Sequence, residues 1–256
     1  MRSINFFIFC LVLSSNVYAK KLPELQTKQA LDNIRLITSD GKYTYYQQRS
    51  GDLQMSTNYD NKVVMKNPKD TYYLLRSTTE QSKIVIEVIK NYHKRLNFFE
   101  LNEIHLIDFG KTTPTKLVDG VDARLHLKDR WLTYFHPREK TIFLKNIVSN
   151  SKPLKVVLNN KVNPYFTPSV IMPTPDTVLY TDINKDGYMA VQMYTLSEKN
   201  ITTVYKSKFA GMRLDLCVLG ENLYMGEFSY DGINLGSSVV KIPLFQNKGF
   251  NVGAGV

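Results

Sequence analysis

Apolar and polar residues alternate along most of the chain. From Ile34 onward, short runs rich in Tyr, Phe, Val, Ile and Thr alternate with polar residues and are interrupted by Gly, Asn, Asp or Pro. A period of two with such turn residues is typical of half-buried β-strands joined by turns. The one convincing helical spacing of apolar residues runs from Leu22 to Ile34, which predicts a short lead-in helix. The pattern therefore predicts an all-β protein.

The predicted strands also repeat. Three segments each open with an aromatic strand that is followed by a second strand across a turn, and their openings lie at Trp131, Thr177 and about residue 223. The interval is 46 residues in each step. This interval resembles the ~40–45 residues of a four-stranded propeller blade and not the ~20–29 residues of a leucine-rich repeat.

Each central unit can be extended to four strands, and two more units fit upstream, in residues 34–66 and 71–118. The sequence therefore predicts a β-propeller of about five four-stranded blades over residues 34–247. The last unit, Met212 to Leu244, shows only three strands, so closing the ring would need a strand from the N-terminal side. A β-sandwich is the alternative, because short strands with a turn every 8–12 residues also describe that architecture.

One unit carries a recognisable local motif. Pro175-Asp176 precedes a strand that ends at Asp182, and Asp186-Gly187 follows. This arrangement resembles the repeat of TolB-type propellers. The resemblance implies a periplasmic propeller that binds protein partners, but it transfers no specific partner-binding residue to this chain.

The start of the chain has the three parts of a signal peptide. Met1-Arg2 is basic, Ile4 to Leu13 is an apolar run of ten residues, and Val17-Tyr18-Ala19 offers the modest side chains that a signal peptidase accepts. The run is too short for a stable membrane anchor. Cys10 lies inside this run and lacks the preceding small residues of a lipidation site. We therefore expect cleavage after Ala19, a periplasmic or extracellular protein, and no transmembrane anchor after cleavage.

These observations divide the chain. The predicted parts are a signal peptide in residues 1–19, a lead-in segment in 20–33, a β-propeller-like domain in 34–247 and a flexible Gly-rich tail in 248–256. After cleavage Cys217 is the only cysteine, so the mature protein can form no internal disulfide and must be stabilised by its core.

The chain is basic, with a formal net charge of +10. In a cytosolic protein this balance would suggest nucleic acid as a partner. Export and the scattered placement of the lysines argue against nucleic acid, since no arginine-rich stripe is visible. The expected partner is instead a protein or an anionic polymer of the cell envelope.

Asp182, Asn184 and Asp186 place oxygen ligands at alternate positions, with Gly187 at the sixth, as in the opening of a calcium loop. Ala190 and Met193 occupy the ninth and twelfth positions, so the acidic closure is missing. A polar hairpin turn is therefore favoured over a calcium site. We expect no other metal and no cofactor, because no zinc, nucleotide or nucleophile motif occurs.

Function is expected to be binding or scaffolding by an exported propeller, and no catalytic residue is assigned. The alternative is a propeller-fold polysaccharide hydrolase, which would use a pair of carboxylates about 5–10 Å apart. Six carboxylates near predicted strand ends are candidates for such a pair: Asp108, Asp122, Asp182, Asp215, Glu227 and Asp231. A calcium-stabilised adhesion module is a third possibility.

Overall fold

The structure is a computed structural model of the chain. It describes residues 34–39, 42–48, 52–57, 60–66, 71–76, 82–90, 100–149, 151–158, 167–184, 186–210, 214–230 and 235–244. All regular structure in these residues is β-strand, which confirms the all-β prediction. No helix in the described residues is long and apolar enough to cross a membrane. The signal peptide, the lead-in helix before Ile34 and the Gly-rich tail lie outside the described residues.

The chain divides into two compact units. Unit 1 comprises residues 1–95 and 102–119, and unit 2 comprises residues 96–101 and 120–256. The strands that begin in unit 1 are β1 (Ile34–Ser39), β2 (Thr44–Gln48), β3 (Leu53–Ser56), β4 (Asn61–Met65), β5 (Tyr72–Arg76), β6 (Lys83–Ile89), β7 (Asn102–Asp108) and β8 (Thr115–His126). Each unit is built from antiparallel meanders, in which neighbours in sequence pair in space.

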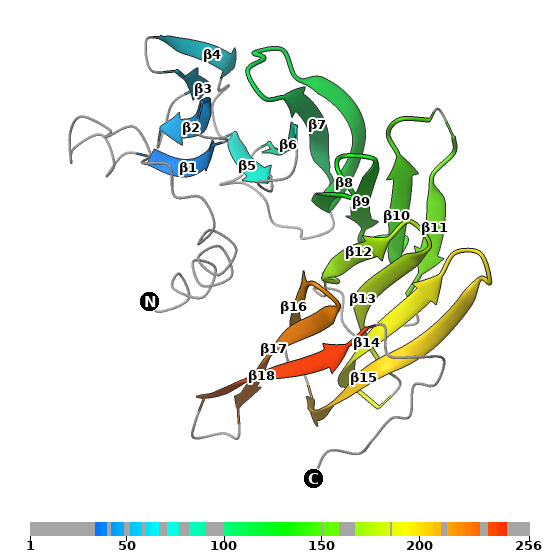
Figure 1. The fold of residues 1–256 in the computed structure, drawn as a ribbon. Helices are drawn as coiled ribbons and strands as arrows, with labels where there is room; N and C mark the ends of the chain where they lie inside the picture. Colours follow the sequence, from blue (N-terminus) through cyan, green and yellow to red (C-terminus); the bar gives the residue numbers. More distant parts are fainter. Residues whose placement is uncertain are drawn as a thin grey trace. The chain divides into compact units, whose positions relative to one another are not determined.

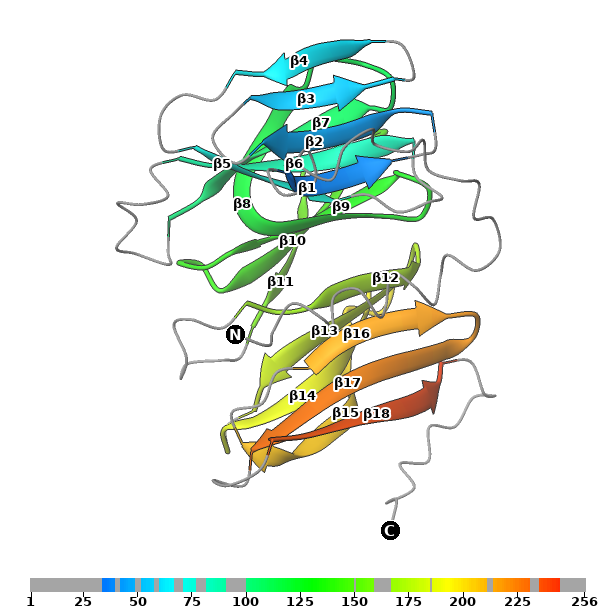
Figure 2. The same cartoon turned by 90° about the vertical axis from the view of Figure 1, so that its left-hand side faces the viewer.

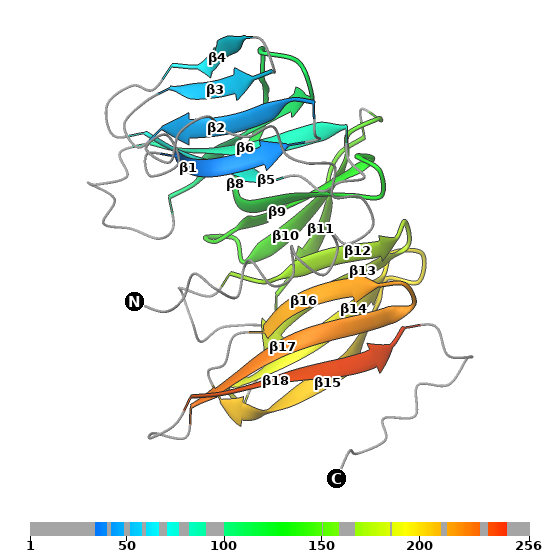
Figure 3. The ribbon, with the colours of Figure 1, turned by 60° about the vertical axis from the view of Figure 1, so that its left-hand side comes forward.

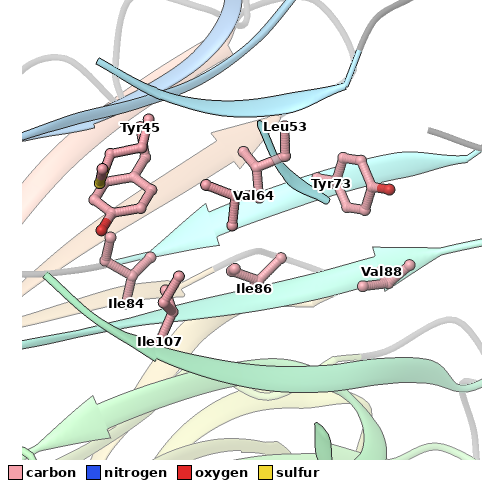
Figure 4. Close-up of a cluster of buried hydrophobic side chains, with 9 residues drawn as sticks. Tyr45, Leu53, Val64, Tyr73, Ile84, Ile86, Val88 and Ile107 are labelled. Atoms are coloured by element: carbon pink, nitrogen blue, oxygen red, sulfur yellow. The ribbon is translucent and has the colours of Figure 1, made fainter. Parts of the chain in front are cut away.

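In unit 1, β1 to β4 form one antiparallel sheet in sequence order, and β5, β6 and β7 pair in the same way (Figure 2). Buried side chains from β2 to β7 form a common core (Figure 4). Its members include Tyr45, Leu53, Val64, Tyr73, Ile84, Ile86, Val88 and Ile107. Since β6 is buried at six of its seven positions, both of its faces are covered.

Strand β8 carries the chain from unit 1 into unit 2. The pairing of β8 with the next strand shifts register between Val121 and Arg124, and Asp122 has a positive φ of 51°. An extra residue in a left-handed conformation is a β-bulge, which bends a strand and increases its twist. Strand β8 is thus one continuous strand with a bulge, and it runs past residue 118, where the predicted upstream unit ends.

The strands of unit 2 after β8 form three meanders (Figures 1 and 3). They are β9 (Trp131–His136), β10 (Thr141–Asn146), β11 (Leu154–Val157), β12 (Val170–Thr174), β13 (Thr177–Ile183), β14 (Tyr188–Thr195), β15 (Asn200–Ala210), β16 (Leu214–Leu219), β17 (Asn222–Tyr230) and β18 (Leu235–Pro243). The last meander has three strands in the described residues, as the sequence indicates.

Successive sheets of unit 2 pack face to face. One cluster joins Ile142 and Leu144 of β10 to Val178 and Tyr180 of β13. A second cluster joins the sheet that contains β13 to the sheet of β16, β17 and β18. Leu179 of β13 contributes to it from the first sheet, and Leu216, Leu223 and Met225 contribute from the second. Strand β13 contributes to both clusters because Val178 and Tyr180 alternate with Leu179 and point to the opposite face. A sheet buried on both faces by its neighbours is the packing unit of a propeller.

In four meanders an equivalent backbone hydrogen bond closes the open end of the hairpin formed by the second and third strands. The residue after the third strand donates its backbone N–H to the carbonyl of the residue before the second strand. The N···O pairs are Phe109–Ser82 at 2.9 Å, Ile147–Arg130 at 3.0 Å, Leu196–Asp176 at 2.8 Å and Leu244–Glu221 at 2.7 Å. The last three acceptors are 46 and 45 residues apart, so the predicted repeat interval corresponds to a repeated backbone geometry.

Candidate functional site

The loop after β7 is held in place by a buried tyrosine of β2. Gly110 donates its backbone N–H to Tyr45 Oη at 2.8 Å, and the same hydroxyl donates to the carbonyl oxygen of Lys111 at 2.8 Å. Tyr45 is fully buried, so its position is fixed by the core. The hydroxyl therefore fixes the loop at two successive residues that are 65 and 66 positions away in the sequence.

Gly110 is required at its position for two reasons. Its φ is +81°, a region that residues with a side chain rarely adopt. A Cβ there would also lie 2.7 Å from Cζ of Tyr43, which is closer than real Cβ contacts come. The loop thus approaches the ring of Tyr43, the residue before β2, as closely as the absence of a side chain allows.

This loop forms one wall of a pocket of about 350 Å³ within unit 1. Its lining residues come from β3, β4, the end of β7 and the loop: Met55, Lys62, Asp108, Gly110, Lys111, Thr112 and Thr113. Except for Met55 and Gly110, every lining side chain is polar or charged. The volume is at the lower end of the ~300–1,000 Å³ of small-molecule sites, so the pocket fits a small chemical group.

The charge of the pocket lining is positive. Asp108 is ion-paired with Lys83, a residue outside the lining. Lys62 contacts Asp60 at 3.6 Å, and both side chains are more than half exposed, so this ion pair contributes only about 0–1 kcal/mol. Among the described residues, no side chain pairs with the ammonium of Lys111 or with the hydroxyls of Thr112 and Thr113. These groups remain available to a ligand.

Asp108 is the one predicted carboxylate candidate in the pocket lining. Asp122 lies at the β8 bulge, 3.5 Å from Arg124, and Asp182 is buried in β13 with Oδ1 accepting a hydrogen bond from the N–H of Ile183. Asp215 and Glu227 lie in β16 and β17, and Asp231 is outside the described residues. The lining of the pocket does not bring two of these carboxylates together.

The Asp182, Asn184 and Asp186 sequence forms the β13–β14 turn. Asn184 Oδ1 accepts hydrogen bonds from the backbone N–H groups of Asp186 and Tyr188, at 3.0 and 2.9 Å. Asp186 contacts Lys206 at 3.6 Å. In the described residues no group of three His, Cys, Asp or Glu side chains could hold a metal ion. The contacts of Asn184 are those of a polar turn, and calcium at this turn stays an untested prediction.

Glu103 on β7 is the centre of a separate charged cluster in unit 1. Its carboxylate contacts Lys90 at 2.7 Å, Lys116 at 3.4 Å and His105 at 3.3 Å. The hydrogen bond from Lys90 lowers the pKa of Glu103 to about 2, helped by His105 and the nearby lysines and opposed by partial burial. Glu103 is therefore a firmly ionised group that is already compensated by cations.

His126 on β8 is a half-buried histidine that links three strands of unit 2. The backbone N–H of Met172 on β12 donates to Nδ1 at 3.4 Å, and Nε2 lies 2.9 Å from Thr133 Oγ1 on β9. Because Nδ1 accepts, the proton of a neutral ring is on Nε2 and is donated to Thr133. Burial lowers the pKa of His126 to about 3, and nearby Arg124 adds to the effect. The neutral ring therefore has a structural role.

The sequence did not indicate the pocket. Gly110-Lys111-Thr112-Thr113 is a small, basic and hydroxyl-bearing segment between two strands, and this is the local signal that was present. The contribution of Met55 and Lys62 depends on the pairing of β3 and β4 and on packing against β7, which no local pattern reports.

Comparison with known proteins identifies similar structures. No protein-family model matches the sequence, and no curated protein matches it. Prolyl oligopeptidase B from Galerina marginata has a TM-score of 0.57 at 8% identity, over 82% of this chain and 32% of that chain. A prolyl endopeptidase has a TM-score of 0.54 at 14% identity, over 82% of this chain and 35% of that chain. The chain thus spans about a third of the length of these two peptidases.

TolB from Acinetobacter baumannii, the type of protein whose repeat the sequence resembles, is also among the similar structures, with a TM-score of 0.45 at 12% identity over 77% of this chain and 52% of that chain. At such identities a structural likeness shows the fold alone. Together with the repeated meanders, the likeness to the two peptidases shows that the chain has the β-propeller fold, and the β-sandwich alternative is dropped.

Proposed function

We propose that the protein is an exported β-propeller that serves as a binding or scaffold module and recognises a protein or a component of the cell envelope, in the periplasm or outside the cell. The observation that carries this proposal is the pocket of unit 1, which combines a loop fixed at its backbone with donors at Lys111, Thr112 and Thr113 that no side chain of the described residues engages. A site whose donors are held in place before the ligand arrives loses little entropy on binding.

The charges favour an anionic component of the envelope over a neutral one. Lys62 and Lys111 line the pocket, and its one carboxylate, Asp108, is already compensated by Lys83. The whole chain has a formal charge of +10, so long-range attraction acts in the same direction as the pocket. Residues 1–19, with the parts of a signal peptide, support a location where such polymers occur.

The pocket supports polysaccharide hydrolysis less well. Hydrolysis requires a second carboxylate across the cleft from the first, and the general acid of the pair must have a raised pKa. Asp108 is the single carboxylate in the lining, and it is already ion-paired with Lys83. The same arrangement suits a binding site, because a paired carboxylate can still accept hydrogen bonds.

Immobilised dextran sulfate, with uncharged dextran as the control, tests the proposal. The protein lacking residues 1–19 should bind dextran sulfate, and the affinity should fall as salt is added, because the attraction is electrostatic. Uncharged dextran should bind weakly or not at all. Release of reducing ends from polysaccharides should stay at the level of a blank.

Absence of binding to dextran sulfate at low salt would overturn recognition of an anionic envelope polymer. Sustained release of reducing ends, abolished by Asp108→Asn, would instead establish the hydrolase. Equal affinity for dextran sulfate and for uncharged dextran would show that the protein does not recognise the negative charge of the polymer.

A further inference from the structure

The lining of the unit 1 pocket offers hydrogen-bond donors of two kinds and one carboxylate acceptor. Lys62 and Lys111 supply ammonium groups, and Thr112 and Thr113 supply hydroxyls. Asp108 supplies carboxylate oxygens while it keeps Lys83 as its ion-pair partner. A ligand that satisfies this set must carry an anionic group and, next to it, hydroxyl groups that can donate.

A phosphate group matches the donors. Its several oxygens accept charge-assisted hydrogen bonds from ammonium groups, and hydroxyls can satisfy the remaining lone pairs. The Asp108 carboxylate would repel a bare phosphate, but it would accept hydrogen bonds from the hydroxyls of a sugar that carries the phosphate. The thioether of Met55 gives the lining one apolar surface, against which the C–H face of a sugar ring can pack.

The size and rigidity of the pocket limit the ligand further. A volume of about 350 Å³ accommodates a sugar unit and its phosphate, and not a long stretch of polymer. Tyr45 fixes the backbone of the loop at Gly110 and Lys111, so the start of the segment that carries Lys111, Thr112 and Thr113 is held in place before the ligand binds.

We propose that this pocket binds a phosphate-bearing sugar unit of an anionic glycan. The inference rests on the proposed binding function and names the ligand class of its site. Lys62 and Lys111 bind the phosphate together with the threonine hydroxyls, and Asp108 accepts from the sugar.

An NMR titration of the ¹⁵N-labelled protein tests the inference with three probes: N-acetylglucosamine 1-phosphate, inorganic phosphate and N-acetylglucosamine. The sugar phosphate should shift the amide signals of Gly110, Lys111, Thr112 and Thr113 at the lowest concentration. Inorganic phosphate should shift the same signals more weakly, and the neutral sugar should shift them least. If inorganic phosphate and the sugar phosphate bind equally, the sugar is not recognised and the inference is wrong.

Two variants localise the binding. Lys111→Gln should weaken binding of the sugar phosphate about tenfold, the loss expected for one charge-assisted hydrogen bond. Lys62→Gln should act in the same direction. Lys152→Gln, a change of an exposed lysine in unit 2, is the matched control and should leave the affinity unchanged. All three positions are at the surface, and well-dispersed amide spectra confirm that each variant is folded.

The outcome also separates this inference from the proposed function. If dextran sulfate still binds and the sugar phosphate does not, or if Lys62→Gln and Lys111→Gln have no effect, this ligand assignment is wrong while the binding function stands. If neither dextran sulfate nor the sugar phosphate binds, both proposals are wrong.

Discussion

Asp176 binds Ser197 through both oxygens of its carboxylate. Oδ1 accepts a hydrogen bond from the backbone N–H of Ser197 and Oδ2 accepts one from its hydroxyl, each at 2.7 Å. The contact ties the β12–β13 turn to the β14–β15 turn, and it gives the Pro-Asp motif of this unit a structural role. The carbonyl of Asp176 also accepts the closing hydrogen bond from Leu196.

Replacing Asp176 should therefore destabilise the protein. Asp176→Ala removes two hydrogen bonds at the surface and should lower the free energy of unfolding by about 1–2 kcal/mol. Asp186→Ala is the matched control, because it removes only the surface ion pair with Lys206 and should cost less than about 1 kcal/mol. Urea denaturation measures both values, and equal losses would argue against the role of Asp176.

Gly110→Ala should be costlier than Gly187→Ala. The two glycines have nearly the same φ, +81° and +84°, but a Cβ at residue 110 meets the Tyr43 ring, while nothing lies within 4 Å of one at residue 187. Both variants incur backbone strain of about 1–2 kcal/mol, and only the first also displaces a neighbour. Thermal unfolding of both should show the larger drop for Gly110→Ala. If the clash with the Tyr43 ring causes the larger drop in melting temperature, adding Tyr43→Ala to Gly110→Ala should reduce the drop to that of Gly187→Ala.

The stability of the protein should fall with acidification through His126. The unfolded chain takes up a proton on this histidine near pH 6.5, whereas the pKa in the folded state is about 3. Between these values the unfolded state binds more protons, so this contribution is fully present above pH 6.5 and is lost as the pH falls towards 3. The slope should reach about 1.4 kcal/mol per pH unit for this one group.

His126→Phe tests the assignment. It removes the hydrogen bonds to Thr133 and Met172, so the variant should be less stable at neutral pH, and its stability should depend less on pH between 4 and 6. His136→Gln, which changes a partly exposed histidine, serves as the comparison and should keep the slope of the unaltered protein. If His126→Phe keeps the full slope, the group responsible for it lies elsewhere.

Calcium should not stabilise the protein. Asn184 already accepts two backbone hydrogen bonds in the β13–β14 turn, and Asp186 lies next to Lys206. A ligand bound only by the folded state must raise the melting temperature. We therefore expect the same melting temperature in EDTA and in excess calcium, by scanning calorimetry. An increase with calcium that is abolished by Asp186→Asn would establish the calcium site.

The N-terminus of the exported protein gives a direct test of the first 19 residues. In a bacterial host that exports the full chain, the mature protein should begin at Lys20. Edman sequencing of the periplasmic or secreted fraction reads this end. Retention of Met1 in a cytoplasmic fraction would contradict export and with it the proposed location.

The sequence predicts the repeat because the second strand of each unit combines buried aromatic or aliphatic residues with turn residues at its ends. Trp131, Thr177 and Asn222 open such strands, and the structure has β9, β13 and β17 begin at these residues. Period-two patterning reports burial locally, which explains why the strands could be found without a structure.

The parts that could not be predicted depend on contacts between residues far apart in sequence. The contact of Tyr45 with Gly110 forms only when β2 and the end of β7 pack in one core. The bulge at Asp122 lets β8 continue past the predicted end of a unit at residue 118, and an aspartate in a left-handed conformation has no distinctive pattern. The pocket is built on the first of these contacts, so it was missed along with it.

The hydrogen bond that closes each of four meanders uses backbone atoms alone. Its carbonyl acceptors are Ser82, Arg130, Asp176 and Glu221, four residues that differ in size, charge and polarity. The hairpin geometry therefore places no demand on side-chain identity at this position. Substitutions at these positions leave this backbone hydrogen bond in place, apart from what the Asp176 side chain adds through Ser197, and this is one physical route by which a chain can keep the backbone path of proteins with which it shares as little as 8% of its residues.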